Sequence, residues 1–383
     1  MRHYLSIAPE LANARQAIEA IRKREPNYPT TLVFQERPSA NPRVTFVHNR
    51  GEYLQPTERV SPGVFSMLPA LPKSEAATRL ALARWLVSSE NPLTPRVVMN
   101  RQWAAFFGRG IVRTTEDFGY QGEAPTHPEL LDWLAGEFIK SGWSMKAMHK
   151  RIVMSATYQQ SSNVTPKLLV KDSTNQLLSR GPRFRLEAEQ LRDQALRVSG
   201  LLSEKVGGPS VFPPQPPGVS TEGSYGGIVW NASPGEDRYR RGLYTFSKRT
   251  SPYAMFSTFD GPSGEFCLAR REVSNTPLQS LTLLNDPVFH EAAQALGGII
   301  ANEKGTVDER IALLIRRCLA RSTEPEELRQ FERFYQSQRD RLIRKELDGA
   351  TIAGPGNGDV FDRALWTLLA RVILNLDEMI TKG

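Results

Sequence analysis

The chain has 383 residues, of which 40% are hydrophobic and 23% are charged, a composition typical of a globular protein rather than a disordered one. Its length exceeds the usual range of a single domain, so we expect two or three packed units. The net charge of +8 is spread along the chain without the basic stripe or recognisable module of a nucleic-acid-binding protein. We therefore expect no nucleic acid partner.

Neither a membrane span nor a signal peptide is predicted. The longest apolar run, residues 364–376, is interrupted by Arg371 and is shorter than the roughly 20 residues that cross a bilayer. The first residues contain no continuous apolar stretch that would mark a signal peptide. As written, the sequence predicts a cytoplasmic protein.

The cysteine pattern and the absence of common motifs argue against cofactors. Neither Cys267 nor Cys318 belongs to a C-x-x-C pair, which excludes a cysteine-rich zinc site and c-type haem attachment. The chain also lacks a P-loop, an H-E-x-x-H motif, a G-x-S-x-G elbow and a dinucleotide fingerprint. We predict no cofactor and no metal site.

The first 73 residues predict an extended N-terminal arm. One helix fits within the first 25 residues, after which frequent prolines prevent regular structure as far as a short extended run at 43–48. We interpret residues 1–73 as the tail of an upstream domain that is missing from this sequence.

Residues 74–206 predict a helical domain. Apolar residues recur there at intervals of three and four, and capping residues mark the helix starts. The expected helices begin near Ser74, at Thr94, at a capping box formed by Thr126 and Glu129, after Ser144, and at Arg185.

Residues 207–241 predict a long loop, because 11 of the 21 residues from 207 to 227 are glycine or proline. Residues 242–247 then predict a short strand, which opens a C-terminal region, 242–383, packed on the first helical domain. Its helices are marked by two capping boxes and by a final apolar stretch: Thr306 with Glu309, Thr323 with Glu326, and residues 361–379. The fold class is therefore mainly α: a bundle-like, multi-helix domain with a few short strands and a long Gly/Pro-rich loop.

Several segments resemble a known family. The clearest are P-T-H-P-E-L-L-D-W-L at 125–134 and T-P-L-Q-S-L-T-L-L-N at 276–285. Shorter matching segments lie at 91–93, 100–103, 107–112, 117–119, 122–123, 142–144, 155–158, 185–189 and 192–193. Together they resemble the planctomycete-specific domain of unknown function numbered 1553, over roughly residues 43–378.

The resemblance carries implications for partners and compartment but none for a reaction. Members of this family usually follow a second uncharacterised domain and often a cytochrome-c-like domain. The resemblance thus implies a protein partner that carries these upstream domains, and an extracytoplasmic or envelope location. It carries no established catalytic residues.

The first candidate site lies on the helix predicted from Arg185. Glu189 and Asp193 stand one helical turn apart, with Arg192 between them. Paired carboxylates can act as general acid and base when their surroundings separate their pKa values. The alternative is an ion-pair network that anchors the helix.

A second candidate is His127 with Asp117 and Glu123 on the preceding loop. An imidazole and carboxylates can converge near a helix start for acid–base work or metal binding. Because a single histidine gives a thin ligand set, packing of His127 in the first turn is the competing interpretation.

A basic, aromatic-rich stretch surrounds the predicted strand at 242–247 and predicts contact with an anionic polymer such as a polysaccharide. Ordinary alternation of inward aromatic and outward charged side chains explains the same pattern. The candidate ligand-binding residues there are Arg241, Tyr244 and Arg249.

The last candidates precede the helix predicted at 276–285. Asp260 can join the others as a catalytic carboxylate, while Asn275 and Gln279 lie where free N–H groups at a helix start attract an anion. Capping by Asn275 alone is the simpler interpretation. Arg101, in the matching segment 100–103, is a further candidate for ligand binding.

Two functions follow from these features. The strong helical framework without a catalytic signature favours a binding or scaffold module of a larger, envelope-associated assembly. The carboxylates and arginines near loops favour instead a carbohydrate-active protein, either a polysaccharide-binding protein or a glycan hydrolase or transferase.

Overall fold

The computed structural model describes residues 4, 7–26, 28, 30–38, 40–72, 76–216 and 229–383. The fold is mainly α, as predicted: 48% of the structure is helical, and the strands among the described residues form two small two-stranded sheets. The chain divides into two compact units, Met1–Asn91 and Pro92–Gly383. No helix among the described residues combines the length and apolarity needed to cross a bilayer.

The first unit contains few elements and little core. Thr45–His48 (β1) and Pro56–Val60 (β2) pair as an antiparallel hairpin in which every residue is exposed, and the expected extended run at 43–48 is thus largely a strand. The Thr78 hydroxyl caps α3, the best-formed helix of this unit. Its elements, in chain order, are η1 (Pro9–Leu11), α2 (Ala12–Arg22), β1, η2 (Asn49–Gly51), β2 and α3 (Arg79–Leu86).

The second unit begins with three helices that share one hydrophobic core: α4 (Thr94–Phe107), α5 (Pro128–Lys140) and α6 (Met145–Val153). α4 begins at Thr94, as predicted, with a proline in its first turn, and it ends at Gly108, which lies in the left-handed region. The buried Asn100 amide bonds both the N–H and the C=O of Val112, at 2.8 and 2.9 Å, so it fixes the loop after α4. Ser144 caps α6 as predicted.

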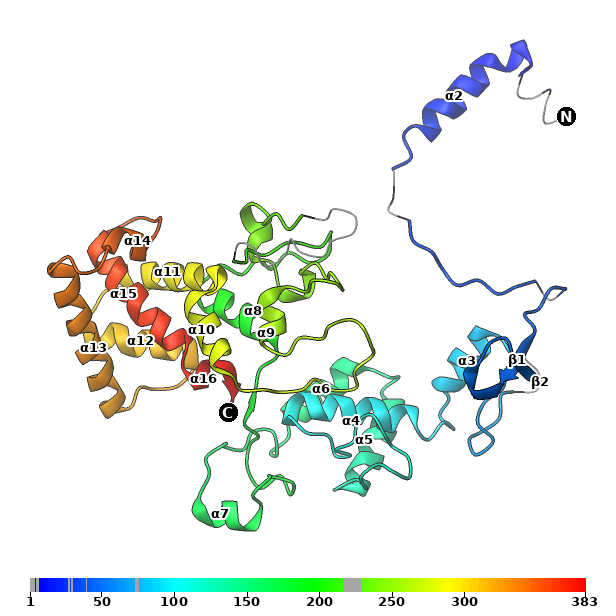
Figure 1. Cartoon of the computed structure of the whole chain (residues 1–383), viewed down its shortest axis with the longest axis horizontal. Helices are drawn as coiled ribbons and strands as arrows, with labels where there is room; N and C mark the ends of the chain where they lie inside the picture. The colour runs from blue at the N-terminus through cyan, green and yellow to red at the C-terminus, as the bar shows by residue number, and fades with distance from the viewer. Residues whose placement is uncertain are drawn as a thin grey trace. The chain divides into compact units, whose positions relative to one another are not determined.

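A larger core fills the C-terminal part of the second unit. Within it α15 (Val360–Leu374) lies along α11 (Pro287–Ala301), as Figure 1 shows, and Trp366 of α15 is completely buried. The other helices of this unit are α7 (Pro166–Lys171), α8 (Ala188–Val198), α9 (Ala254–Thr258), α10 (Pro277–Asn285), α12 (Val307–Leu319), α13 (Pro325–Ile343), α14 (Gly349–Ala353) and α16 (Asp377–Ile380).

A short antiparallel pairing ties the C-terminus to the middle of the chain. Phe184–Arg185 (β3) pairs with Thr381–Lys382 (β4). The Lys382 ammonium donates to the Phe106 carbonyl at 2.9 Å and lies 4.0 Å from the Tyr158 ring centroid. The last residues therefore connect the two cores of the second unit.

The strand predicted at 242–247 is wrong. Gly242–Tyr244 forms a 3-10 turn (η4), as does Gly235–Tyr239 (η3), and only an isolated parallel bridge joins Thr245 to Val211. The chain turns there because Gly242 lies directly against Glu189, where a Cβ atom would meet backbone and side chain at about 3 Å. Residues 217–228 of the predicted Gly/Pro-rich loop, and the boundary at 73 and 74, lie outside the described residues.

Several predicted helix ends move by one to three residues because a neighbour takes the capping role. The N-cap of α5 is His127 without a side-chain bond, α8 is capped by Glu187 with Gln190, and α10 by Thr276 with Gln279 instead of Asn275. The box expected at 323 and 326 forms at Glu324 and Glu327, whereas the box of Thr306 and Glu309 is confirmed. The expected final helix is interrupted at Asn375.

Candidate functional site

Two adjoining cavities lie beside the N-terminal half of α8. The Asp193 cavity has a volume of about 440 Å³ and the Asp260 cavity about 450 Å³. Both are lined by Glu187, Gln190 and Arg271, so these three side chains stand between them. The Asp193 cavity is further lined by Glu189, Asp193, Arg241, Phe246 and Phe256, and the Asp260 cavity by Arg101, Arg185, Asp260, Arg270 and Glu272.

Glu189 and Asp193 lie one turn apart on α8, as predicted, and both line the Asp193 cavity. Arg185, by contrast, belongs to β3 and does not precede them on the helix. The capping box of Glu187 and Gln190 explains this, because it starts the helix only at Ala188.

Arg271 holds Glu189 in a bidentate ion pair, with N–O distances of 2.6 and 3.0 Å. Burial raises the pKa of Glu189, but the hydrogen bonds and charge of Arg271 outweigh it and lower that pKa below its usual value. Glu189 is therefore ionised at neutral pH and cannot serve as a general acid.

Asp193 supports the turn that replaces the predicted strand. Its carboxylate accepts the backbone N–H of Gly242 at 2.6 Å and lies 3.4 Å from Nε of Arg241. Asp193 and Arg241 thus meet at the cavity wall, where half of the Arg241 side chain remains exposed.

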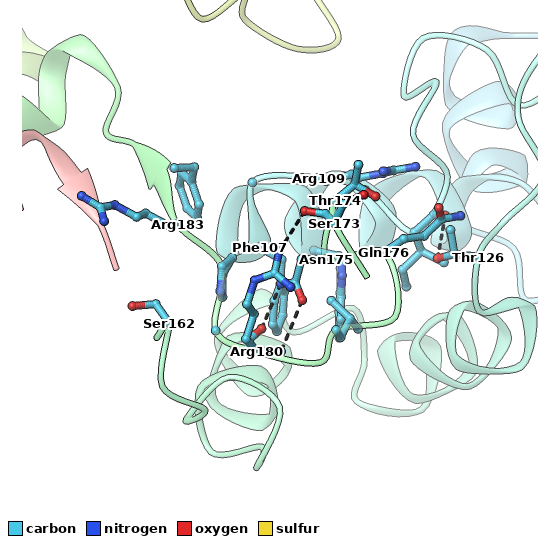
Figure 2. Close-up of a pocket in the computed structure, with 18 of the residues that line it drawn as sticks. Phe107, Arg109, Thr126, Ser162, Ser173, Thr174, Asn175, Gln176, Arg180 and Arg183 are labelled. Carbon is cyan, nitrogen blue, oxygen red and sulfur yellow. Dashed lines mark hydrogen bonds between the residues drawn. The ribbon is translucent and has the colours of Figure 1, made fainter. Parts of the chain in front are cut away.

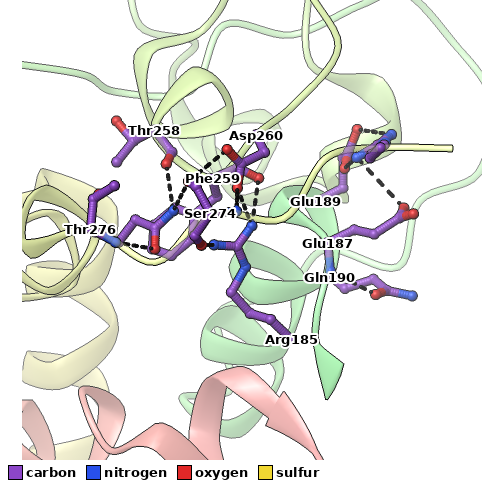
Figure 3. A network of polar contacts seen from close by, with 11 residues as sticks. Arg185, Glu187, Glu189, Gln190, Thr258, Phe259, Asp260, Ser274 and Thr276 are labelled. Atoms are coloured by element: carbon purple, nitrogen blue, oxygen red, sulfur yellow. Dashed lines mark hydrogen bonds and ion pairs between the residues drawn. The ribbon is translucent and has the colours of Figure 1, made fainter. Parts of the chain in front are cut away.

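Asp260 is the centre of a polar network that joins three segments of the chain (Figure 3). It forms an ion pair with Arg185 and accepts from the Ser274 N–H and hydroxyl at 3.0 and 2.8 Å. Although burial raises the pKa of Asp260, Arg185 and Ser274 lower it below the usual value. Its backbone has a φ of 58°, so these contacts hold a left-handed conformation that is rare for aspartate.

Gln279 extends this network, whereas Asn275 does not. The Gln279 amide donates to the Thr258 carbonyl at 3.0 Å and to the Ser274 hydroxyl at 3.2 Å. Asn275 lines neither of the two cavities. Gln279 thus positions the residues around Asp260.

Arg192 of the first candidate site and Arg240 of the basic stretch are structural. Arg192 is completely buried and donates to the carbonyls of Arg240 and Arg238, at 2.5 and 2.9 Å. The equally buried Arg240 stacks on the Tyr244 ring, with 3.8 Å between the guanidinium carbon and the ring centroid. Arg249 is exposed and lines neither cavity. The stretch therefore does not form one continuous binding surface.

A third cavity, the Arg180 cavity, adjoins β3 and has a volume of about 330 Å³ (Figure 2). It shares Gly108 and Phe184 with the Asp260 cavity. Its other linings include Trp103, Phe107, Arg109, Thr126, His127, Ser173, Thr174, Asn175, Gln176, Arg180 and Arg183.

The structure separates His127 from the carboxylates expected beside it. His127 lines the Arg180 cavity, and its Nδ1 is 2.9 Å from the Thr126 hydroxyl. Asp117 instead accepts from the Gly119 N–H at 2.6 Å, and Glu123 pairs with Arg113 at 3.1 Å. Within the described ranges, no three histidine, cysteine, aspartate or glutamate residues gather as a metal site would require.

Residues 78–335 match the sequence model of a family described as a protein of unknown function (DUF1553). The chain belongs to this family. All residues that line the three cavities fall within the DUF1553 match, which ends inside α13. No curated protein and no solved structure matches the chain.

Two arginines that line these cavities carry no clear signal in the local sequence. Arg271 is the partner of Glu189, and Arg180 lines the cavity named after it. Both lie on irregular segments, where no periodic pattern in the sequence indicates which way a side chain faces. Their proximity to the cavities arises only from packing.

Proposed function

We propose that residues 92–383 form a non-catalytic binding module whose ligand is an acidic polysaccharide, held in the Asp193 and Asp260 cavities. The observation that carries this proposal is the ion pairing of the candidate carboxylates. Glu189 and Asp260 each have an arginine partner and a lowered pKa. Acid–base catalysis by two carboxylates needs one of them protonated near neutral pH, and neither meets that condition.

The arginines around the Asp260 cavity support an anionic ligand. Arg101 is exposed at its wall and has no hydrogen-bond or ion-pair partner in the part of the chain that the structure describes. Among the described residues Arg270 pairs only with Glu116, at 3.7 Å, and both side chains are half exposed. Two available guanidinium groups at one cavity suit carboxylate or sulfate groups, which they bind by paired hydrogen bonds.

Two adjoining cavities suit a polymer better than a small molecule. Since Glu187, Gln190 and Arg271 line both, neighbouring units of one chain can occupy the two cavities in succession. Phe246 and Phe256 in the Asp193 cavity supply apolar surface for the faces of sugar rings.

Titration calorimetry of the purified protein tests the proposal. We expect a polyuronate or a sulfated polysaccharide to bind at moderate and at high salt, and a neutral polysaccharide to bind at least about tenfold more weakly, a difference of about 1.4 kcal/mol. The double variant Arg101→Gln with Arg270→Gln should lose most of this affinity. Arg316→Gln, an exposed arginine outside the three cavities, is the charge-matched control.

Assay of new reducing ends during the same incubations tests the absence of turnover. Release of reducing ends by the wild type, lost in Glu189→Gln or Asp260→Asn, would establish a glycan hydrolase and contradict the proposal. If the double variant and its control bind the polysaccharide equally well, Arg101 and Arg270 do not hold the ligand, and the proposed site is wrong.

The scaffold role is proposed for the first unit. Leu32, Val33 and Phe34 are at least four-fifths exposed, which is unusual for consecutive apolar side chains unless another protein covers them. We propose that residues 1–73 act as an arm that contacts a protein carrying the upstream domains of the family. Cross-linking from residues 30–38 in native extracts should yield such a protein, and cross-links only within copies of this chain would contradict it.

A further inference from the structure

We propose that the Arg180 cavity is a separate binding site for a single sugar unit that carries a carboxylate or a sulfate. The inference takes its ligand class from the proposed function, but it concerns other residues. The Arg180 cavity neighbours the Asp260 cavity, since Gly108 and Phe184 line both.

The wall of the cavity is a loop, 172–181, that is held in place by its own polar groups. The buried Asp172 carboxylate accepts the backbone N–H groups of Gln176 and Leu177 at 2.7 and 3.0 Å. The Asn175 amide bonds both the C=O and the N–H of Arg180, at 2.9 and 3.3 Å. A loop fixed in this way presents its remaining side chains in one arrangement, which limits the entropy lost when a ligand binds.

The charge of the cavity is entirely of one sign. Arg109, Arg180 and Arg183 line it, and none of its lining residues is an aspartate or glutamate. Arg109 and Arg183 have carboxylate partners outside the cavity, Glu123 at 3.7 Å and Asp377. The cavity therefore favours an anion.

Arg180 supplies the least compensated charge. Its guanidinium donates to two backbone carbonyls, those of Asp172 at 2.8 Å and Ser173 at 3.0 Å, and to no carboxylate within the described residues. Since a guanidinium has five N–H groups, further donors remain for a ligand. Figure 2 shows Arg180 in the middle of the cavity, beside Phe107 and Asn175.

Hydroxyl and amide groups at the rim indicate a sugar rather than a bare anion. Ser173, Thr174 and Gln176 are exposed on the loop, and their side chains have no hydrogen-bond partner among the described residues. Such groups can both donate to and accept from ring hydroxyls. Trp103 and Phe107, which stack with their centroids 4.1 Å apart, form the apolar side of the same cavity.

The size of the cavity restricts the ligand. Its volume of about 330 Å³ lies at the lower end of the range of about 300–1,000 Å³ for small-molecule sites, so the cavity suits one sugar unit better than an oligosaccharide. A unit at the end of a polysaccharide that occupies the Asp260 cavity meets this condition.

A pair of matched variants tests the site. Arg109 and Arg113 both pair with Glu123, at 3.7 and 3.1 Å, but only Arg109 lines the cavity. Ligand-observed NMR titration with glucuronic acid, galactose 6-sulfate, galactose and inorganic sulfate should show binding of one or both acidic sugars. We expect Arg109→Gln to weaken this binding by about fivefold or more, about 1 kcal/mol, and Arg113→Gln to leave it unchanged within about twofold.

Arg180→Gln should abolish binding of the acidic sugar, and a thermal unfolding curve shows whether the loop survives the change. Because this variant also loses bonds to two carbonyls, Thr174→Ala provides a milder test that leaves the loop intact. It should weaken the binding of the acidic sugars but not the binding of sulfate. Sulfate that binds as tightly as the acidic sugars would reduce the site to an anion site and overturn the proposal.

The two proposals fail separately. If the polysaccharide binds and depends on Arg101 and Arg270, while neither acidic sugar binds, the inference on the Arg180 cavity is overturned and the proposed function stands. Binding of an acidic sugar that depends on Arg109, without any binding of polysaccharide, would support the cavity and contradict the proposed function.

Discussion

Arg271 and Glu189 lie 82 positions apart in the sequence, yet their side chains share two hydrogen bonds at the boundary of two cavities. The pair joins α8 to the irregular segment before α10, and it keeps Glu189 ionised. The same contact thus stabilises the fold and withholds a carboxylate from catalysis.

Removing the arginine should destabilise the protein and alter its response to acid. Arg271→Gln leaves the partly buried Glu189 without its ion pair, at an expected cost of about 1–3 kcal/mol in the free energy of unfolding. Because the pKa of Glu189 is lowered in the folded state, the stabilisation is complete above pH 4.5, its usual value, and is lost as the pH falls below it. Thermal unfolding between pH 3 and 7 measures both effects.

Arg270→Gln is the matched control for this prediction, since Arg270 pairs with Glu116 only at 3.7 Å in a half-exposed position. We expect it to change the stability by less than about 0.5 kcal/mol. Equal losses in the two variants would show that the bidentate contact contributes nothing specific.

Asp286 should cause the opposite pH dependence. Burial raises the pKa of this N-cap residue of α11 to about 6, even though it accepts the Val288 N–H and lies near Arg192. The folded protein then binds a proton that the unfolded chain releases at about pH 4, so this contribution to stability is lost as the pH rises from 4 to 6.

Asp286→Asn tests this contribution because asparagine is also a good N-cap. The variant should be more stable than the wild type at pH 8, by about 1–2 kcal/mol, and the advantage should disappear near pH 4. Chemical denaturation at several pH values measures it, and a constant difference across this range would contradict the titration of Asp286.

Substitution by alanine at two neighbouring glycines of α11 should change the stability of the protein in opposite directions. At Gly297 an added Cβ atom would approach the backbone N and the hydroxyl of Thr367 to 2.6 Å, since α15 packs directly there. At Gly298 the nearest neighbouring atom is Nε of Arg363, at 4.0 Å.

We therefore expect Gly297→Ala to destabilise the protein by about 1–3 kcal/mol through overpacking. Gly298→Ala should stabilise it by about 0.5–1 kcal/mol, the gain from a better helix former. Denaturant titration of both variants measures the difference, and similar behaviour of the two would contradict the close contact of α11 with α15.

The two cysteines should differ in their reaction with a thiol reagent. Cys267 is exposed, whereas Cys318 is buried in α12, where burial raises the pKa of its thiol to about 12. In the native protein one thiol should react, and the second only in denaturant. Two fast-reacting thiols in the native state would contradict the buried position of α12.

The elements that depend on neighbouring residues could be predicted from the sequence. The predicted capping box of Thr306 and Glu309 is present, and the apolar stripe that follows it, Ile311, Leu314, Ile315 and Cys318, is buried. Capping, apolar periodicity and the stops at glycine act within one or two turns, so they can be recognised locally. The mainly α class follows from the sum of such segments.

Which polar side chains meet depends on how distant segments pack together. Asp193 holds a turn at Gly242 where local composition favoured a strand, and Asp260 pairs with Arg185 from 75 positions away. Such contacts leave no period in the sequence, because the residues occupy irregular segments whose positions depend on packing against α8 and α10. The cavities are decided in the same way, since their walls come from distant parts of the chain that only the packed core brings together.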